Sequence, residues 1–283
     1  MPLAPSLPPG TPMAAPDLFA GRIAVVTGAG DAVGQAIAVE LARAGASLVL
    51  MDGSLEACDA AVAAVGAVAG VAKAMAVALT DEAAVARAFD EIEGAMGPVT
   101  LLVNNARTEP DEPVELMDPQ RWRRVTHGVI DGTFNVVREM GLRRIADGAG
   151  GAIVNTGTPY VDTGGAGRAD ITAAKAAVMN LTKSLAVEWA PYDIRVNGIA
   201  AGYVAGAEAG PVAEEDLAPT VPAGRLCQPH EIAWCVVYMC SPFAAYLTGA
   251  TMVVDGASWQ RPGRTPPRFE PIRDRYGKAL GKP

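Results

Sequence analysis

Residues 22–34 read RIAVVTGAGDAVG, an apolar run followed by a glycine-containing loop. The apolar run predicts a buried strand over residues 22–27, and the spacing of residues 33–44 predicts a helix directly after the loop. Glycines such as Gly28 and Gly34 let the backbone approach a pyrophosphate there, while the helix N-terminus supplies N–H donors and a positive dipole. The stretch therefore predicts a nucleotide site. A tight strand-to-helix turn without a ligand is the alternative.

The alternation of strand and helix continues along the chain. Short apolar runs predict further strands at residues 47–51, 73–79, 99–104, 152–155, 194–199 and 251–254. Helical spacing predicts helices at residues 55–65, 82–96, 120–145, 169–189 and 231–239. Short Val-, Ile- and Leu-rich strands separated by helices are typical of a buried parallel sheet. The expected fold class is α/β: a single doubly wound Rossmann-type domain with a parallel seven-stranded sheet flanked by helices.

Two tails flank this domain, which we expect to cover residues 19–256. Residues 1–18 are rich in Pro and Ala, which disfavours a helix or a central strand and predicts a flexible or surface-draped arm. Residues 257–283 form a second Pro-rich tail that is basic and carries interleaved aromatic residues. This tail could contact a neighbouring subunit, cover a pocket or simply aid solubility.

Composition limits the class of protein. The chain has 283 residues, of which 50% are hydrophobic, and a net charge of −8, which favours a filled core and argues against disorder and against nucleic-acid binding. It lacks the run of ~20 apolar residues that a transmembrane helix needs, and its first residues do not resemble a secretory signal. We therefore expect a cytoplasmic protein with no membrane partner. The 2 histidines and 4 cysteines show no metal-ligand spacing, so no metal is expected.

A carboxylate follows the second expected strand. Asp52 can accept hydrogen bonds from the ribose diol of adenosine, and it would repel a 2′-phosphate. Asp31, in the glycine loop, adds a second negative charge, and no Arg or Lys replaces either residue. If a dinucleotide binds, we expect NAD(H) rather than NADP(H). A role as a loop cap is the alternative for Asp52.

Several segments together resemble the short-chain dehydrogenase/reductase family over residues 20–256. They are TGAGDAVG at 27–34, LLVNNA at 101–106, GAIVNTGT at 151–158, AAKAAVMNLTKSLAVEWAPYDIRVNGI at 173–199 and YLTGATMVVDGA at 246–257. Their order and spacing imply the family's fold. The resemblance implies cofactor contacts at Gly28, Asp31, Val33, Gly34, Asp52, Asn104, Ala106, Lys175, Gly202 and Val204.

The sequence departs from the family pattern where the chemistry is expected. The family's YxxxK motif has a tyrosine four residues before the lysine, and here Ile171 stands at that distance before Lys175. The tyrosine is the general acid and base of the family, and isoleucine has no ionisable proton. The family's serine corresponds to Thr158, which keeps a hydroxyl, and its asparagine corresponds to Val129. The usual proton relay is therefore expected to be missing.

Other side chains near this place are candidates for chemistry. We expect catalytic roles for Thr158, Lys175 and Tyr160, a phenol at the start of the loop that lines the family's pocket. The candidate substrate contacts are Arg107, Ile171 and Tyr203, and an arginine can hold a carboxylate or phosphate with two hydrogen bonds. Asp170 and His127 are alternatives, although helix neighbours point about 100° apart. A surface or packing role is the competing interpretation for these side chains.

Three functions remain open. The first is an atypical enzyme that acts on a small organic substrate, by redox or non-redox chemistry, with NAD(H) in its cleft. The second is a catalytically silent subunit or nucleotide-binding partner of an active paralogue. The third is an NAD-dependent alcohol or ketone oxidoreductase with a rearranged relay. The resemblance also implies a homo-oligomer, dimer or tetramer, through the helices at 120–145 and 169–189, or a hetero-oligomer with an active family member.

Overall fold

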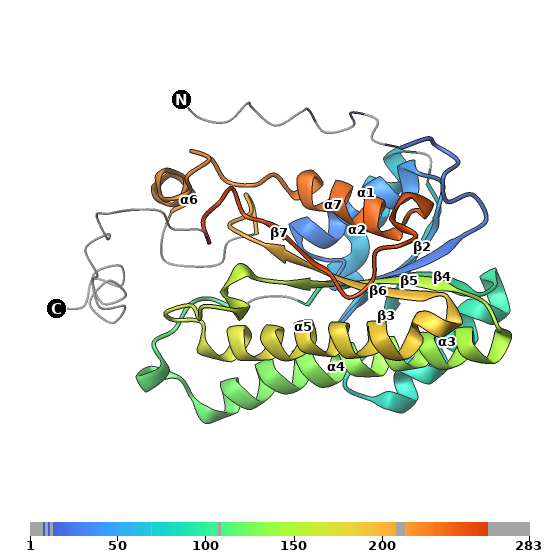
Figure 1. Cartoon of the computed structure of the whole chain (residues 1–283), viewed down its shortest axis with the longest axis horizontal. Helices are drawn as coiled ribbons and strands as arrows, with labels where there is room; N and C mark the ends of the chain where they lie inside the picture. Colours follow the sequence, from blue (N-terminus) through green and yellow to red (C-terminus); the bar gives the residue numbers. More distant parts are fainter. Residues whose placement is uncertain are drawn as a thin grey trace.

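A parallel sheet runs through the centre of the molecule, with helices on both faces (Figure 1). The computed structural model describes residues 8, 11, 14–68, 70–106, 109–207 and 213–259. The strands are β1 (Ile23–Thr27), β2 (Ser47–Asp52), β3 (Ala72–Ala76), β4 (Val99–Asn104), β5 (Gly151–Gly157), β6 (Ile194–Ala201) and β7 (Thr251–Val254). The helices are α1 (Ala32–Arg43), α2 (Leu55–Ala67), α3 (Glu82–Met96), α4 (Pro119–Asp147), α5 (Ala169–Trp189), α6 (Glu214–Leu217) and α7 (Pro229–Cys240).

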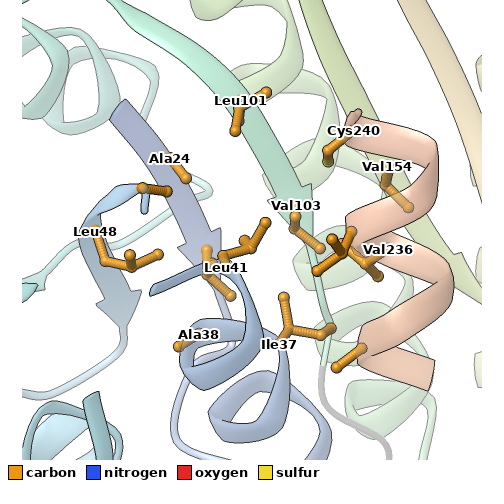
Figure 2. Close-up of a cluster of buried hydrophobic side chains, with 14 of the residues drawn as sticks. Ala24, Ile37, Ala38, Leu41, Leu48, Leu101, Val103, Val154, Val236 and Cys240 are labelled. Atoms are coloured by element: carbon orange, nitrogen blue, oxygen red, sulfur yellow. The ribbon is translucent and has the colours of Figure 1, made fainter. Parts of the chain in front are cut away.

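The alternation of side chains along the strands builds two cores, one on each face of the sheet. Val26 and Leu50 face α1, α2 and α7, whereas Val25 and Val49 face α3, α4 and α5. Because successive side chains of a strand point to opposite faces, a strand buried on both faces is apolar throughout. Figure 2 shows part of the first core, where Ile37 and Leu41 of α1 and Val236 of α7 meet apolar side chains of the strands.

The strand order opens a crevice beside β1. The order is β3-β2-β1-β4-β5-β6-β7, and each neighbouring pair is parallel. The chain leaves β1 towards α1 on one face, whereas the helix that follows β4, α4, packs on the other face. In doubly wound sheets, ligands bind at such a switch point, outside the carboxyl ends of the strands. The predicted fold class, with seven parallel strands and helices on both faces, is confirmed.

Two boundaries differ from the sequence-based expectation. β3 ends at Ala76 rather than at residue 79, because β2, to which it pairs, ends there with the pair Asp52 and Ala76. The short helix α6 lies in the segment after Tyr203, where the Ala-, Gly- and Pro-rich sequence shows no helical periodicity.

Little of the two expected tails falls within the described residues. Before the domain, Ala14 and Leu18 pack against the first core. The expected basic tail from residue 260 onward, and also Arg107, lie outside the described residues. Within the described part of the chain, no helix combines the length and the apolar character needed to cross a bilayer.

Candidate functional site at the switch point of the sheet

The loop between β1 and α1 is shaped by close backbone contacts. Gly28 has a φ of 57°, and a Cβ there would lie 1.7 Å from the carbonyl oxygen of Asn105. A Cβ on Gly34 would lie 2.3 Å from the carbonyl oxygen of Gly28. Both glycines are therefore required by packing within the protein, since they bring the start of α1 against the end of β4. Gly28 also lines the cleft.

Asp31 is the N-cap of α1. Its Oδ1 atom accepts hydrogen bonds from the N–H of Gly34 at 2.7 Å and from Nδ2 of Asn105 at 2.9 Å. Burial raises the pKa of Asp31, while these hydrogen bonds and the positive charge of Lys175 act to lower it. The carboxylate lines the cleft. A half-buried carboxyl group is thus held where the helix offers its first donors.

Asn105 joins the loop to the sheet. Its Nδ2 also donates to the carbonyl oxygen of Gly28 at 3.0 Å, and its Oδ1 accepts from Oγ1 of Thr156 at 3.3 Å. Asn104, in contrast, is buried within the sheet and donates to Oδ1 of Asn155 at 2.9 Å. Sequence reasoning selected Asn104 and missed Asn105. The signal was available, because Asn104 is the last residue of β4 and the next residue lies at the crevice.

One side of the cleft suits an adenosine. Its lining includes Gly28, Asp52, Val77, Ala78 and Leu79. Asp52 accepts hydrogen bonds from the N–H groups of Gly30 at 3.1 Å and Gly53 at 2.7 Å, through different oxygens. Each carboxylate oxygen retains a lone pair for a further donor. Asp52 therefore caps the loop and also faces the cleft, so the two roles considered for it are compatible.

The other side of the cleft, where the nicotinamide end of a dinucleotide is expected, contains most of the other cofactor contacts that the resemblance implies. Its lining includes Asp31, Val33, Asn105, Ala106, Thr156, Thr158, Arg168, Ile171, Lys175, Gly202 and Val204. Asn105 and Ala106 line both sides, so the two sides meet at the end of β4. Arg168 forms an ion pair with Asp111 at 2.6 Å. Nothing in the sequence pattern singled out Arg168, because an arginine in a loop is most often solvated.

Lys175 is the buried cation of this side. Its side chain is 4% exposed, and Nζ donates to the carbonyl oxygen of Thr156 at 2.7 Å and to Oγ1 of the same residue at 3.1 Å. Burial lowers the pKa of Lys175 to about 8, and the negative charge of Asp31 opposes that change. An amine with this pKa can both donate and accept protons near neutral pH.

Ile171 lies one helical turn before Lys175 in α5 and forms part of the same wall. It is 4% exposed and belongs to an apolar cluster with Val125 and Val129 of α4. Thr158, which also lines this side, caps a short helical turn by accepting a hydrogen bond from the N–H of Tyr160 at 3.5 Å. A hydroxyl and an amine thus share the nicotinamide side of the cleft with an apolar side chain.

The remaining candidates lie apart from this lining. The hydroxyl of Tyr160 donates to the hydroxyl of Tyr203 at 2.8 Å, and the two rings meet edge to face. Asp170 is fully buried and pairs with Arg121 at 2.9 Å. His127 is exposed on α4 and pairs with Asp131, one turn further along the helix. Among the described residues, neither phenol is part of the lining that contains Lys175.

Comparison with known proteins shows the family to which the chain belongs. Residues 28–257 match the family described as Enoyl-(Acyl carrier protein) reductase. A galactitol 2-dehydrogenase (L-tagatose-forming) from Cereibacter sphaeroides is 37% identical over 243 residues, which cover 83% of this chain and 94% of that protein. The structure of a short chain dehydrogenase from Bacillus anthracis matches with a TM-score of 0.82 and 30% identity, over 88% of this chain and 100% of that one. The chain belongs to the short-chain dehydrogenase/reductase family.

A second protein of similar structure was solved with a nicotinamide cofactor bound. An NAD+-bound xylitol dehydrogenase matches with a TM-score of 0.77 and 27% identity, over 84% of this chain and 99% of that one. The predicted family is thus confirmed, and its relatives are named as dehydrogenases and reductases. Members of this family bind NAD(H) or NADP(H).

The cleft of this short-chain dehydrogenase/reductase can be compared with the shape and charge of such a dinucleotide. The carboxylate of Asp52 suits a ribose diol on the adenosine side. Lys175 and Thr158 offer polar groups on the nicotinamide side. Between the two, the N–H of Gly34 already donates to Asp31. The residues therefore fit both ends of a dinucleotide. The diphosphate between the two ends would lie near the carboxylate of Asp31.

Proposed function

We propose that this chain binds NAD(H) in the cleft and acts on a small hydroxylated or oxo organic substrate without a phenol proton relay. The observation that carries the proposal is the cavity that Lys175 and Thr158 line, which is present although Ile171 forms part of its wall. The named relatives act on galactitol and xylitol, which supports a small polyol-like substrate. The nicotinamide, when bound, would supply or accept the hydride.

The roles of the chain's own residues follow from their positions. Thr158 is suited to bind a substrate oxygen, because its hydroxyl both donates and accepts. Lys175 is suited to exchange the proton that accompanies hydride transfer, because burial lowers its pKa. Ile171 can exclude water but cannot move a proton. General acid–base catalysis typically contributes ~10²–10⁴-fold. Because the phenol that supplies it in the family is replaced by Ile171, we expect slow redox turnover or a step that needs no redox change.

A catalytically silent subunit is the second candidate function. The observation that favours it is the apolar cluster of Ile171 with Val125, Val129 and Ala174, which surrounds the position where the family's phenol is expected. A silent subunit would keep nucleotide binding and show no turnover with any substrate. Measurements of binding and of turnover on the same preparation separate the two functions.

Asp52 is expected to set the cofactor preference. The chain should bind NADH at least ~10-fold more tightly than NADPH, because a 2′-phosphate would approach the carboxylate of Asp52 on the adenosine side. Asp52→Asn keeps the shape, removes the charge and should reduce this ratio. Fluorescence titration with both nucleotides measures it, with Asp59→Asn on the exposed side of α2 as the control. Equal affinity of the natural chain for NADH and NADPH would contradict the assignment.

We also propose a homo-oligomer formed through α4 and α5. Large apolar side chains are exposed on these helices, including Phe134, Leu142 and Val187, and such groups favour burial against another chain. Sedimentation should give the mass of a dimer or tetramer, and Phe134→Asp should lower that mass. A monomer at micromolar concentration would contradict the homo-oligomer and favour assembly with another family member.

A further inference from the structure

The first helix carries its own anion at its N-terminus. Asp31 accepts from the N–H of Gly34 and from the side chain of Asn105, and the N–H of Val33 also acts on its pKa. In doubly wound folds, the N–H groups at the start of this helix are the donors that hold the pyrophosphate of a dinucleotide. The carboxylate therefore uses a donor on which the diphosphate would depend.

Asp31 lies where the carboxylate and a bound diphosphate would come close to each other. The residue lines the nicotinamide side, and its partner Asn105 lines both sides. A diphosphate that links an adenosine near Asp52 to a nicotinamide near Lys175 must pass the region where the two sides meet. The diphosphate and the carboxylate are both anions, and like charges repel most strongly where water is excluded.

Capping alone does not require a carboxylate at this place. Ser54 caps α2 with its hydroxyl, accepting from the N–H of Ala57 at 3.3 Å. Asp81 caps α3 by accepting from the N–H of Ala84 at 3.0 Å, and it does so on the exposed surface. Serine and aspartate cap helices about equally well. The distinctive features of Asp31 are its side-chain bond to Asn105 and its place in the cleft.

We propose that Asp31 is a built-in competitor for the diphosphate of NAD(H). The carboxylate accepts the N–H of Gly34, and a dinucleotide would bind only when Asp31 turns away from that donor. This inference rests on the proposed function and adds a determinant of affinity to it. It assigns Asp31 a role opposite to that of a favourable cofactor contact, and it implies weak dinucleotide binding by the natural chain.

The test compares two capping aspartates. The full chain is prepared with Asp31→Ser, with Asp31→Asn and, as the matched control, with Asp81→Ser. Calorimetric titrations use NADH, ADP and adenosine as probes. We expect Asp31→Ser to tighten NADH and ADP binding by about 10-fold or more, since the repulsion between carboxylate and phosphate is removed and a neutral hydroxyl holds the N–H of Gly34 less strongly than a carboxylate does. Adenosine, which has no phosphate, should bind all four proteins equally, and Asp81→Ser should change nothing.

The outcomes separate this inference from the proposed function. If the natural chain and Asp31→Ser bind NADH and ADP equally, or if Asp31→Ser binds them more weakly, the competitor role is overturned while NAD(H) binding stands. If no variant binds NADH, both proposals are overturned. Asp31→Asn retains an oxygen that can cap the helix, so it provides the same comparison if the serine variant does not fold, and it must tighten ADP binding.

Discussion

Ile171→Tyr is expected to raise NAD-dependent dehydrogenase activity by ~10²–10⁴-fold, the usual contribution of a positioned general acid or base. Ile171 lines the nicotinamide side of the cleft together with Thr158 and Lys175. A tyrosine there would present a phenol one helical turn before the ammonium of Lys175, and a nearby positive charge lowers the pKa of a phenol. Initial rates of NADH formation with galactitol and xylitol measure the effect.

The control for this gain is Ile171→Phe, which adds the same ring without the hydroxyl. Both rings must find room beside Val125 and Val129, so thermal unfolding of both variants shows whether any loss comes from overpacking. Equal activity of the tyrosine and phenylalanine variants would contradict the proposal that the missing phenol limits the reaction. Full dehydrogenase activity in the natural chain would instead favour a rearranged relay.

Gly28→Ala is expected to destabilise the fold by about 3–5 kcal/mol, within the range seen for severe overpacking and backbone strain. The added Cβ would lie 1.7 Å from the carbonyl oxygen of Asn105, at a φ of 57° that L-residues rarely adopt. Relief requires the loop and the end of β4 to separate, which also removes the bond from Asn105 to the carbonyl oxygen of Gly28. Urea-induced unfolding, followed by circular dichroism, measures the change.

Gly21→Ala separates the two causes of this cost. Gly21 has a φ of 75°, and nothing lies within 4 Å of its added Cβ. This variant should therefore show only the conformational penalty of about 1 kcal/mol. If Gly28→Ala loses no more stability than Gly21→Ala, the close approach of the loop to β4 is not a determinant of the fold.

The two sides of the cleft differ in how far they follow the family pattern. The adenosine side keeps Gly28 and Asp52, with the carboxylate oriented by two backbone donors. The nicotinamide side keeps Lys175 and a hydroxyl at Thr158, but Ile171 adds apolar surface to its wall. Binding and turnover are therefore expected to respond to different substitutions.

The order of strands and helices could be read from the sequence because it depends on local patterns. A run such as residues 23–26 is apolar at every position, as a parallel strand buried on both faces requires. The glycine loop and Asp52 could be placed as well, since the loop directly follows β1 and Asp52 is the last residue of β2. The family motifs added the expected fold, which the strand order confirms.

The identities of the side chains that share the cleft depend on contacts between distant parts of the chain. Asp31 meets Asn105, which lies 74 residues away, and Tyr160 meets Tyr203, which lies 43 residues away. Arg168 reaches the lining from a loop that carries no periodic signal. Periodicity determined where strands and helices lie, because it records only which face of an element is buried. Tertiary packing alone decided that the side chain of Asn105 bonds to the carboxylate of Asp31, because that contact depends on how two separate loops meet at one edge of the sheet.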